Sequence, residues 1–331
     1  MIGRKPRGFS PHSWMAAYPQ GVVLLYRVVI VQGMLMRRHA LPGPAIVSAI
    51  ISTVKVLAAM VLTLTLLTAM LPGPALAAGP ETVEFREGDL TLEGLLFRPE
   101  GNGPFPAVVA MHDCAGLTDA LGATRTRYRD WAQQLVKMGF VVLFPDSYGP
   151  RGLDGQCGER NQAIRSDQER GADALAARRW LQQRGDVKGD HISLLGWSNG
   201  ATSVLWAVRP HGKREDRGDF RSAIAFYPEC RRLDTTAWSA RVPTLILIGA
   251  LDDWSSPQEC ERMVAGAKGR SARASIVVYP GAFHDFDHPS RPPQVRSGFA
   301  FSADGSGRIH SGTNATARAD AQKRVSQWLE R

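Results

Sequence analysis

A serine flanked by two glycines is the first residue in this sequence that could carry chemistry. Ser198 lies between Gly196 and Gly200 in the segment LLGWSNGA, after an apolar run and before a stretch of helical character. This pattern is typical of a nucleophilic serine on a sharp turn between a strand and a helix, where small neighbours let the two elements approach each other. Because roughly 0.2 matches are expected by chance in a chain of this composition, the interpretation depends on the surrounding residues.

A nucleophilic serine needs a base to take its proton and an acid to orient that base. His284 is the favoured base, because it follows the last apolar strand run in the loop YPGAFHDFDH. Two adjacent acids, Asp252 and Asp253, follow the strand run PTLILIG earlier in the chain. The resulting order of serine, acid and histidine is that of triads built on a nucleophile elbow. The spacing leaves open which of the two aspartates orients the base.

His288 is the competing histidine, four residues after His284. Two histidines at this spacing can bind a metal ion when both lie on one helix. Gly281 before them and Pro289 after them disfavour a helix at this point. We therefore expect a catalytic histidine in a loop, and no metal.

Backbone N–H groups must stabilise the oxyanion that forms when the serine attacks a carbonyl. The N–H of Asn199 is one candidate, because it lies at the start of the helix that follows the serine. The second should come from the loop after the strand run FPAVVAM, where Cys114 is favoured and Asp113 is the alternative.

The elements that must position these residues are strands and helices in alternation. From residue 82 onward, apolar β-rich runs alternate with stretches of helical periodicity, which is typical of an α/β domain with a largely parallel sheet. A hairpin is expected over 82–98 and a long helix over 162–183, ahead of a strand over 191–197. No linker divides the region, so we expect residues 79–331 to form a single domain.

The net charge of +9 could indicate a nucleic-acid or membrane partner. However, residues 1–78 hold seven basic and no acidic residues, which leaves 33 basic against 31 acidic residues in the remainder. The excess therefore belongs to the leader, and we expect no nucleic-acid partner. Met34 or Met36, just before two arginines, would make a more ordinary start, so residues 1–33 are not expected in the natural product.

The leader has the pattern of a secretory signal peptide. Lys55 precedes an apolar run over 56–71, and the small residues of 75–77 (Ala-Leu-Ala) follow a Pro-Gly-Pro break. At 16 residues the run is shorter than the roughly 20 that a membrane-spanning helix needs. We therefore expect an exported protein, periplasmic or secreted, with membrane anchoring by an uncleaved leader as the alternative.

Four cysteines remain in the exported part. An even number in an oxidising compartment permits two disulfides. We expect the pairs Cys114–Cys157 and Cys230–Cys260, because the members of each pair would lie near the same end of the sheet. Four free thiols are the alternative.

Five stretches, VVAMHDCAGL, FPDSYGPRG, LLGWSNGA, LILIGALDD and YPGAFHDFD, resemble the dienelactone hydrolase family of the α/β-hydrolase fold over about residues 82–330. The resemblance implies a mainly parallel sheet of about eight strands with helices on both faces. It also implies hydrolysis of ester or lactone bonds without a cofactor or metal. Carried over by position, it gives Ser198 as nucleophile, His284 as base and Cys114 as the loop donor.

The family pattern favours Asp252 as the acid when counted from the strand end, and Asp253 when counted back from Pro257. We favour Asp252, because the strand end is the more rigid reference. The best-known members carry cysteine where this chain carries its elbow serine. They also hold the substrate carboxylate with two arginines, of which Arg151 roughly matches one.

At the second arginine position the chain has His288, with Arg291 as the nearest substitute. We therefore expect a substrate other than dienelactone itself. Trp197, beside the nucleophile, is a further candidate for substrate contact. The loop over 290–312 is expected to border the site.

The leading hypothesis is a serine hydrolase that acts on a small-molecule ester or lactone. A peptidase or acyltransferase on the same scaffold is the first alternative, because a fold and a triad do not determine the acyl acceptor. A non-catalytic envelope protein that binds ligands is the second. The sequence predicts no oligomeric state.

Overall fold

The computed structural model describes residues 79–210 and 218–331, with isolated positions between 43 and 60. Most of the predicted signal peptide and the start at Met34 or Met36 lie outside these described residues. The stretch Ala78–Arg331 forms one unit. In the described part of the chain, no helix is both long and apolar enough to cross a membrane.

Eight strands form one sheet in the order β1-β2-β4-β3-β5-β6-β7-β8. β1 and β2 form the expected hairpin, β2 also pairs antiparallel with β4, and the other neighbouring pairs are parallel. β4, β6 and β7 are buried along their whole length, in agreement with their continuous apolar sequences. The strands are β1 (Glu81–Glu87), β2 (Leu90–Phe97), β3 (Phe105–Met111), β4 (Val141–Pro145), β5 (Val187–Trp197), β6 (Ala223–Phe226), β7 (Thr244–Gly249) and β8 (Ala274–Tyr279).

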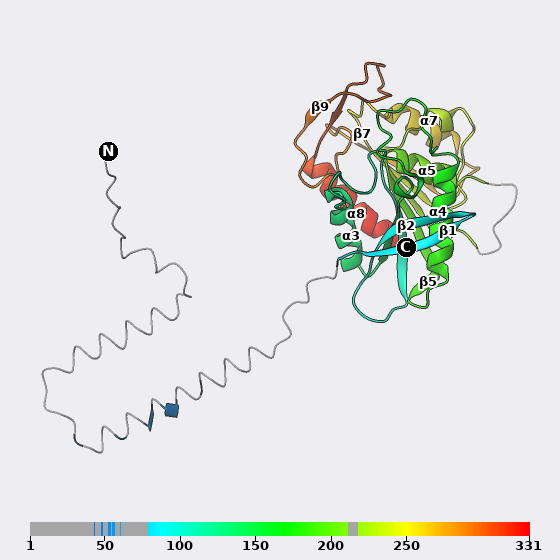
Figure 1. The fold of residues 1–331 in the computed structure, drawn as a ribbon. Helices are drawn as coiled ribbons and strands as arrows, with labels where there is room; N and C mark the ends of the chain where they lie inside the picture. The colour runs from blue at the N-terminus through cyan, green and yellow to red at the C-terminus, as the bar shows by residue number, and fades with distance from the viewer. Residues whose placement is uncertain are drawn as a thin grey trace, which may run out of the picture. The chain divides into compact units, whose positions relative to one another are not determined.

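Helices cover both faces of this sheet (Figure 1). α3 and α8 pack together on one face, where the Arg318 guanidinium lies 2.6 Å from the Asp130 carboxylate. α4 and α5 pack against each other on the opposite face. The helices are α3 (Thr126–Lys137), η2 (Gly149–Arg151), α4 (Glu169–Gln182), α5 (Asn199–Ala207), α6 (Arg231–Asp234), α7 (Pro257–Gly266) and α8 (Ala315–Leu329), and a small hairpin consists of β9 (Gln294–Arg296) and β10 (Ile309–Ser311).

The fold predicted from the sequence is confirmed, with one difference in the helix before β5. That helix, predicted over 162–183, begins only at Glu169. The preceding residues form a loop whose side chains bind neighbours: Asn199 donates its amide N–H to Gln162 at 3.0 Å, and Arg165 contacts Asp167 at 2.7 Å. These contacts, one of them with α5, outweigh the helical periodicity of the segment.

Candidate active site

The turn between β5 and α5 holds Ser198 in a backbone conformation that side chains resist, with φ of 52° and ψ of −117°. A Cβ atom at Gly200 would lie 2.3 Å from the carbonyl oxygen of Met111, and one at Gly196 would lie 2.6 Å from the carbonyl oxygen of Gly200. Both glycines are therefore required by the close approach of strand and helix. The structure has the elbow geometry that the sequence pattern predicts.

Ser198, His284 and Asp252 form a continuous chain of hydrogen-bond contacts. Ser198 Oγ lies 3.1 Å from His284 Nε2, and His284 Nδ1 lies 2.8 Å from Asp252 Oδ2. The other oxygen of Asp252 accepts the backbone N–H groups of Trp254 and Ser255 at 3.0 and 2.8 Å. The histidine and the acid are buried, and the serine is 8% exposed. The acid is thus held in place by its own loop while it contacts the imidazole.

The charge of Asp252 changes the basicity of His284. Burial by itself would lower the pKa of the imidazole, but the neighbouring carboxylate raises it through its charge and its hydrogen bond. The result is a pKa above the ordinary value. A histidine with this environment is a stronger base than one in water.

The second aspartate of the pair contacts a different histidine. Asp253 Oδ2 lies 2.7 Å from His310 Nδ1, and Asp253 Oδ1 accepts the backbone N–H of His310 at 2.8 Å. The structure therefore brings Asp252, and not Asp253, to His284. The turn after β7 thus presents its two aspartates to different histidines.

The expected oxyanion donors, Cys114 and Asn199, line the same cavity as Ser198. The backbone N–H of Asp113, the alternative donor, is engaged with the hydroxyl of Tyr128 at 2.8 Å. Among the two loop candidates, this leaves the N–H of Cys114.

Both expected disulfides are present, Cys114–Cys157 and Cys230–Cys260. The first joins the loop after β3 to the loop that precedes α4. It is accompanied by a hydrogen bond of 2.6 Å from the N–H of Gln156 to the carbonyl of Cys114. The wall of the cavity beside the serine is therefore cross-linked.

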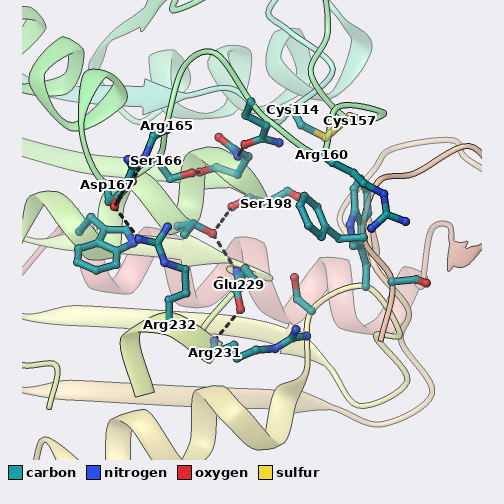
Figure 2. A pocket seen from close by; sticks show the side chains of 18 of the residues that line it. Cys114, Cys157, Arg160, Arg165, Ser166, Asp167, Ser198, Glu229, Arg231 and Arg232 are labelled. Carbon is teal, nitrogen blue, oxygen red and sulfur yellow. Dashed lines mark hydrogen bonds and ion pairs between the residues drawn. A yellow bond between two sulfur atoms is a disulfide. The ribbon is translucent and has the colours of Figure 1, made fainter. Parts of the chain in front are cut away.

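A cavity of about 540 Å³ opens on the serine (Figure 2). In Figure 2 the Cys114–Cys157 disulfide and Arg160 lie on one side of Ser198, and Arg232 and Asp167 lie on the other. Its lining combines charged and aromatic side chains: Arg160, Arg165, Arg231, Arg232, Asp167, Glu229, Trp206, Trp254 and Phe301.

The charges in this cavity are only partly balanced. Asp167 contacts both Arg165 and Arg232, at 2.7 and 2.8 Å. Arg160 makes no ion pair with the residues that the structure describes. Burial raises the pKa of Glu229, which favours its neutral form. The lining thus carries an excess of positive charge.

Two residues expected to contact substrate lie elsewhere. Arg151 binds Asp173 with two hydrogen bonds of 2.9 and 2.7 Å and is absent from the cavity lining. Trp197 is fully buried, and its indole N–H donates to Asp287 at 2.8 Å. Each side chain satisfies its polar group inside the protein, which turns it away from the serine.

The sequence reasoning missed the aromatic part of the site. The ring of Trp254 lies 4.7 Å from that of His284 and 4.4 Å from that of Phe299. Phe301 and Ser302 of the loop over 290–312 line the cavity, in agreement with the expectation that this loop borders the site. The position of Trp254 directly after the two aspartates was the available signal.

Comparison with known proteins identifies the family. The model of the dienelactone hydrolase family matches residues 92–331. The chain belongs to this family. It is therefore a hydrolase that acts on ester bonds.

A curated relative from Bradyrhizobium sp is 28% identical over 200 residues, which cover 58% of this chain and 77% of the relative. It is named "Probable 2-oxo-3-(5-oxofuran-2-ylidene)propanoate lactonase". Among solved structures, dienelactone hydrolase from Anabaena variabilis is similar at a TM-score of 0.53 and 17% identity, covering 76% of this chain and 98% of that one. The apo form of Thermogutta terrifontis esterase 2 is similar at a TM-score of 0.54 and 18% identity, covering 78% and 97%. At these identities, the two structures bear on the fold of the hydrolase.

Proposed function

We propose that this chain is an exported serine hydrolase that cleaves small carboxylic esters or lactones through Ser198, His284 and Asp252. The observation that carries the proposal is the chain of contacts from the Asp252 carboxylate through His284 to the hydroxyl of Ser198. This arrangement is the one that activates a serine for attack on a carbonyl.

In the proposed mechanism, Ser198 Oγ attacks the carbonyl carbon while His284 Nε2 takes the hydroxyl proton. The N–H groups of Cys114 and Asn199 stabilise the oxyanion. Collapse of the tetrahedral intermediate breaks the bond to the alcohol, which receives the proton from His284. A water molecule, deprotonated by the same histidine, then attacks the acyl-enzyme and releases the acid.

The cavity supports a substrate of small or medium size with a negative charge away from the bond that is cleaved. A volume of about 540 Å³ suits a small organic molecule. The guanidinium of Arg160, which forms no ion pair with the described residues, and the partly balanced group of Arg165, Arg231 and Arg232 favour a carboxylate or phosphate on the substrate, away from the bond that is cleaved. The lactonase name of the Bradyrhizobium relative agrees with a cyclic ester as substrate.

Export to the periplasm or the medium is part of the proposal. Two disulfides are typical of proteins that mature in an oxidising compartment. The signal-like leader supports the same compartment.

The experiment that tests the proposal is active-site labelling. The exported domain is treated with a serine-directed phosphonate probe and with p-nitrophenyl acetate, alongside Ser198→Ala. We expect the substitution to abolish both labelling and turnover. Ser193→Ala is the matched control, since Ser193 lies on the same strand and its hydroxyl contacts Ser222 at 3.0 Å.

Two outcomes contradict the proposal. Labelling that survives Ser198→Ala would show that another residue is the nucleophile. A parent protein that is neither labelled nor active on esters or lactones would favour a binding protein on the same scaffold.

A further inference from the structure

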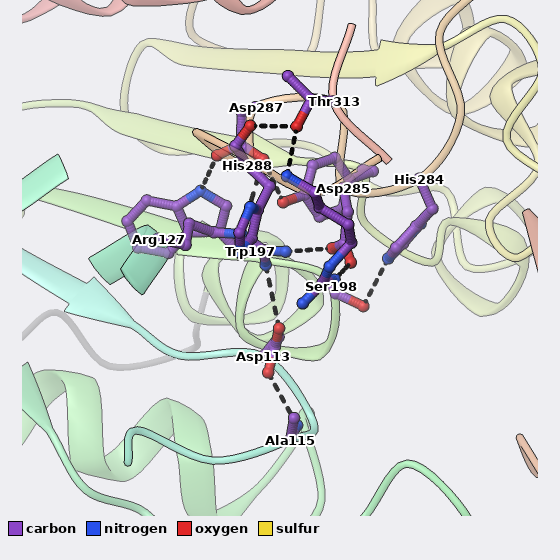
Figure 3. A network of polar contacts seen from close by, with 12 residues as sticks. Asp113, Ala115, Arg127, Trp197, Ser198, His284, Asp285, Asp287, His288 and Thr313 are labelled. Carbon is purple, nitrogen blue, oxygen red and sulfur yellow. Dashed lines mark hydrogen bonds and ion pairs between the residues drawn. The ribbon is translucent and has the colours of Figure 1, made fainter. Parts of the chain in front are cut away.

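A buried guanidinium lies between the two loops that carry the catalytic groups. Arg127 is in the first turn of α3 and is 3% exposed. Each of its three nitrogens faces a different carboxylate (Figure 3). Nη1 lies 3.0 Å from Asp113, Nη2 contacts Asp285, and Nε lies 3.8 Å from Asp287.

These three acids occupy positions next to the residues of the proposed mechanism. Asp113 directly precedes Cys114, and its carboxylate also accepts the N–H of Ala115 at 2.8 Å. Asp285 directly follows His284. One side chain of α3 therefore touches both the loop that offers the oxyanion donor and the loop that carries the base.

Asp287, the third carboxylate near Arg127, connects this guanidinium to the nucleophile elbow. It accepts hydrogen bonds from the indole of Trp197 at 2.8 Å, the indole of Trp131 at 2.7 Å and the hydroxyl of Tyr227 at 2.6 Å. Trp197 is the residue before Ser198. Tyr227 also packs its ring 4.4 Å from that of His284. The base loop is thus bound to the elbow strand and to the residue that follows β6 through buried polar contacts.

The backbone at Asp285 supports a role beyond packing. This residue has a φ of 62°, a conformation uncommon for a residue with a side chain, and it is only 3% exposed. Burial by itself would raise the pKa of its carboxyl, but the charges of Arg127 and Arg291 outweigh burial and lower it. Backbone strain of this kind persists where the surroundings enforce it. The side chain of Asp285 is held by ion pairs with Arg127 and Arg291.

We propose that Arg127 is a positioning residue, whose contacts with Asp113 and Asp285 set the distance between the oxyanion donor and the base. The proposal rests on the proposed function, because positioning has meaning only if Ser198 and His284 react. Loss of the guanidinium would remove the positive charge that Asp113 and Asp287 contact and one of the positive charges that Asp285 contacts, and the two loops would relax apart. A shift of about 1 Å in a catalytic group can lower a rate by about 100-fold.

The proposal also predicts the direction of pH effects. The charged and titratable groups that face His284 are Asp252, Asp285, Arg127 and Tyr227. The positive charge of Arg127 lowers the pKa of His284, and the negative charge of Asp285 raises it. Removal of one charge should therefore shift the pH profile opposite to removal of the other. A purely structural role would not produce this pair of opposite shifts.

The test uses three substitutions in the full exported domain. Arg127→Lys keeps the charge but cannot contact several carboxylates in one plane. Arg127→Met removes the charge, and Asp285→Asn removes the opposite charge while it tolerates the same backbone conformation. For Arg127→Lys we expect kcat on p-nitrophenyl acetate to fall by about 10- to 100-fold, with KM within about twofold of the parent.

For the pH profile of kcat/KM, we expect the apparent pKa to rise in Arg127→Met and to fall in Asp285→Asn. Arg241→Lys is the matched control. Arg241 contacts Asp219 at 2.6 Å and lies before β7, at the opposite end of the strands from Ser198. Its substitution should leave kcat and the pH profile unchanged.

The outcomes separate the two proposals. If Ser198→Ala retains turnover, the proposed function fails, whatever the Arg127 variants do. If Ser198→Ala abolishes turnover while Arg127→Lys and Asp285→Asn keep the parent kcat and pH profile, the positioning role is overturned. If Arg127→Lys does not fold by circular dichroism, Asp285→Asn and Asp113→Asn decide, because each removes one ion pair of Arg127 and leaves the guanidinium with its other partners.

Discussion

Two aspartates next to each other in the chain each bind a histidine, and only one of these pairs is linked to a serine. The contact between Asp252 and His284 is 2.8 Å, and that between Asp253 and His310 is 2.7 Å. In the first pair both side chains are fully buried, whereas in the second they are 38% and 48% exposed. The distance alone therefore does not distinguish the pairs. The pairs differ in their burial and in the contact that His284 makes with Ser198.

Burial matters because it removes the competition of water. The buried imidazole has Ser198 on one nitrogen and Asp252 on the other, so its orientation is determined on both sides. The exposed pair instead fastens the loop over 290–312 to the turn after β7. The N–H of Ala303 donates to the Asp253 carbonyl at 2.8 Å, which adds a second contact between the same segments. In the proposed mechanism the buried pair serves the chemistry, whereas the exposed pair holds a wall of the cavity.

The largest expected effect on activity comes from substituting each of the two aspartates by asparagine in turn. In Asp252→Asn the imidazole loses the partner that orients it and stabilises its charged form, so we expect kcat to fall by about 10³- to 10⁴-fold. In Asp253→Asn we expect kcat within about threefold of the parent. The measurement is steady-state hydrolysis of p-nitrophenyl acetate. Similar losses in both variants would remove the distinction between the pairs.

A second prediction concerns pH. The base must be neutral to accept a proton, so activity is lost as the pH falls through the pKa of His284. Because that pKa is raised above its ordinary value of 6.5, kcat/KM should rise with pH through an apparent pKa above 6.5. His310→Ala should leave this profile unchanged. A profile that moves with His310 would mean that the exposed histidine takes part in the reaction.

A smaller effect is expected on substrate binding. His310→Ala frees the loop that carries Phe301 into the cavity lining, so the KM of a bulky ester should rise by about two- to threefold. The kcat for p-nitrophenyl acetate should stay within about twofold, since the triad is not touched. Steady-state kinetics with a small and a bulky ester measures the ratio. An equal effect on the two esters would argue against a wall function.

The smallest effect is on stability. An exposed ion pair contributes about 0–1 kcal/mol to the free energy of unfolding, and less at high salt. Asp253→Asn should therefore lower the unfolding free energy by about 1 kcal/mol or less, as measured by urea denaturation. A loss of several kcal/mol would show that the loop contact is part of the core of the fold.

The sequence predicted the framework well because its signals are local. Continuous apolar runs marked the strands, and the glycines beside Ser198 marked a turn that no larger side chain fits. The disulfide pairs followed from the ends of the sheet at which their cysteines lie. Each of these conclusions needed only short stretches of chain and the topology that connects them.

The remaining features of the site depend on the directions of side chains, which the local sequence does not determine. Asp252 and Asp253 are adjacent, and only the turn after β7 decides which faces His284. Arg127 and Asp285 are 158 residues apart in the chain, so their contact could not be inferred from spacing. Arg151 was expected near the substrate from its position in a motif, but Asp173 of α4 binds it. Ion pairs between residues this far apart in the sequence can be identified only from the three-dimensional structure.

Because of the disulfide between Cys114 and Cys157, the redox conditions under which the protein is produced and stored should affect its measured activity. Cys114, whose backbone N–H is the proposed oxyanion donor, is covalently bound to Cys157 in the same wall of the cavity. Protein produced in a reducing cytosol, or stored with a thiol reagent, would carry an intact set of catalytic side chains around an untethered cavity. Preparations of identical sequence and purity would then differ in specific activity, and a thiol titration would have to accompany every kinetic constant.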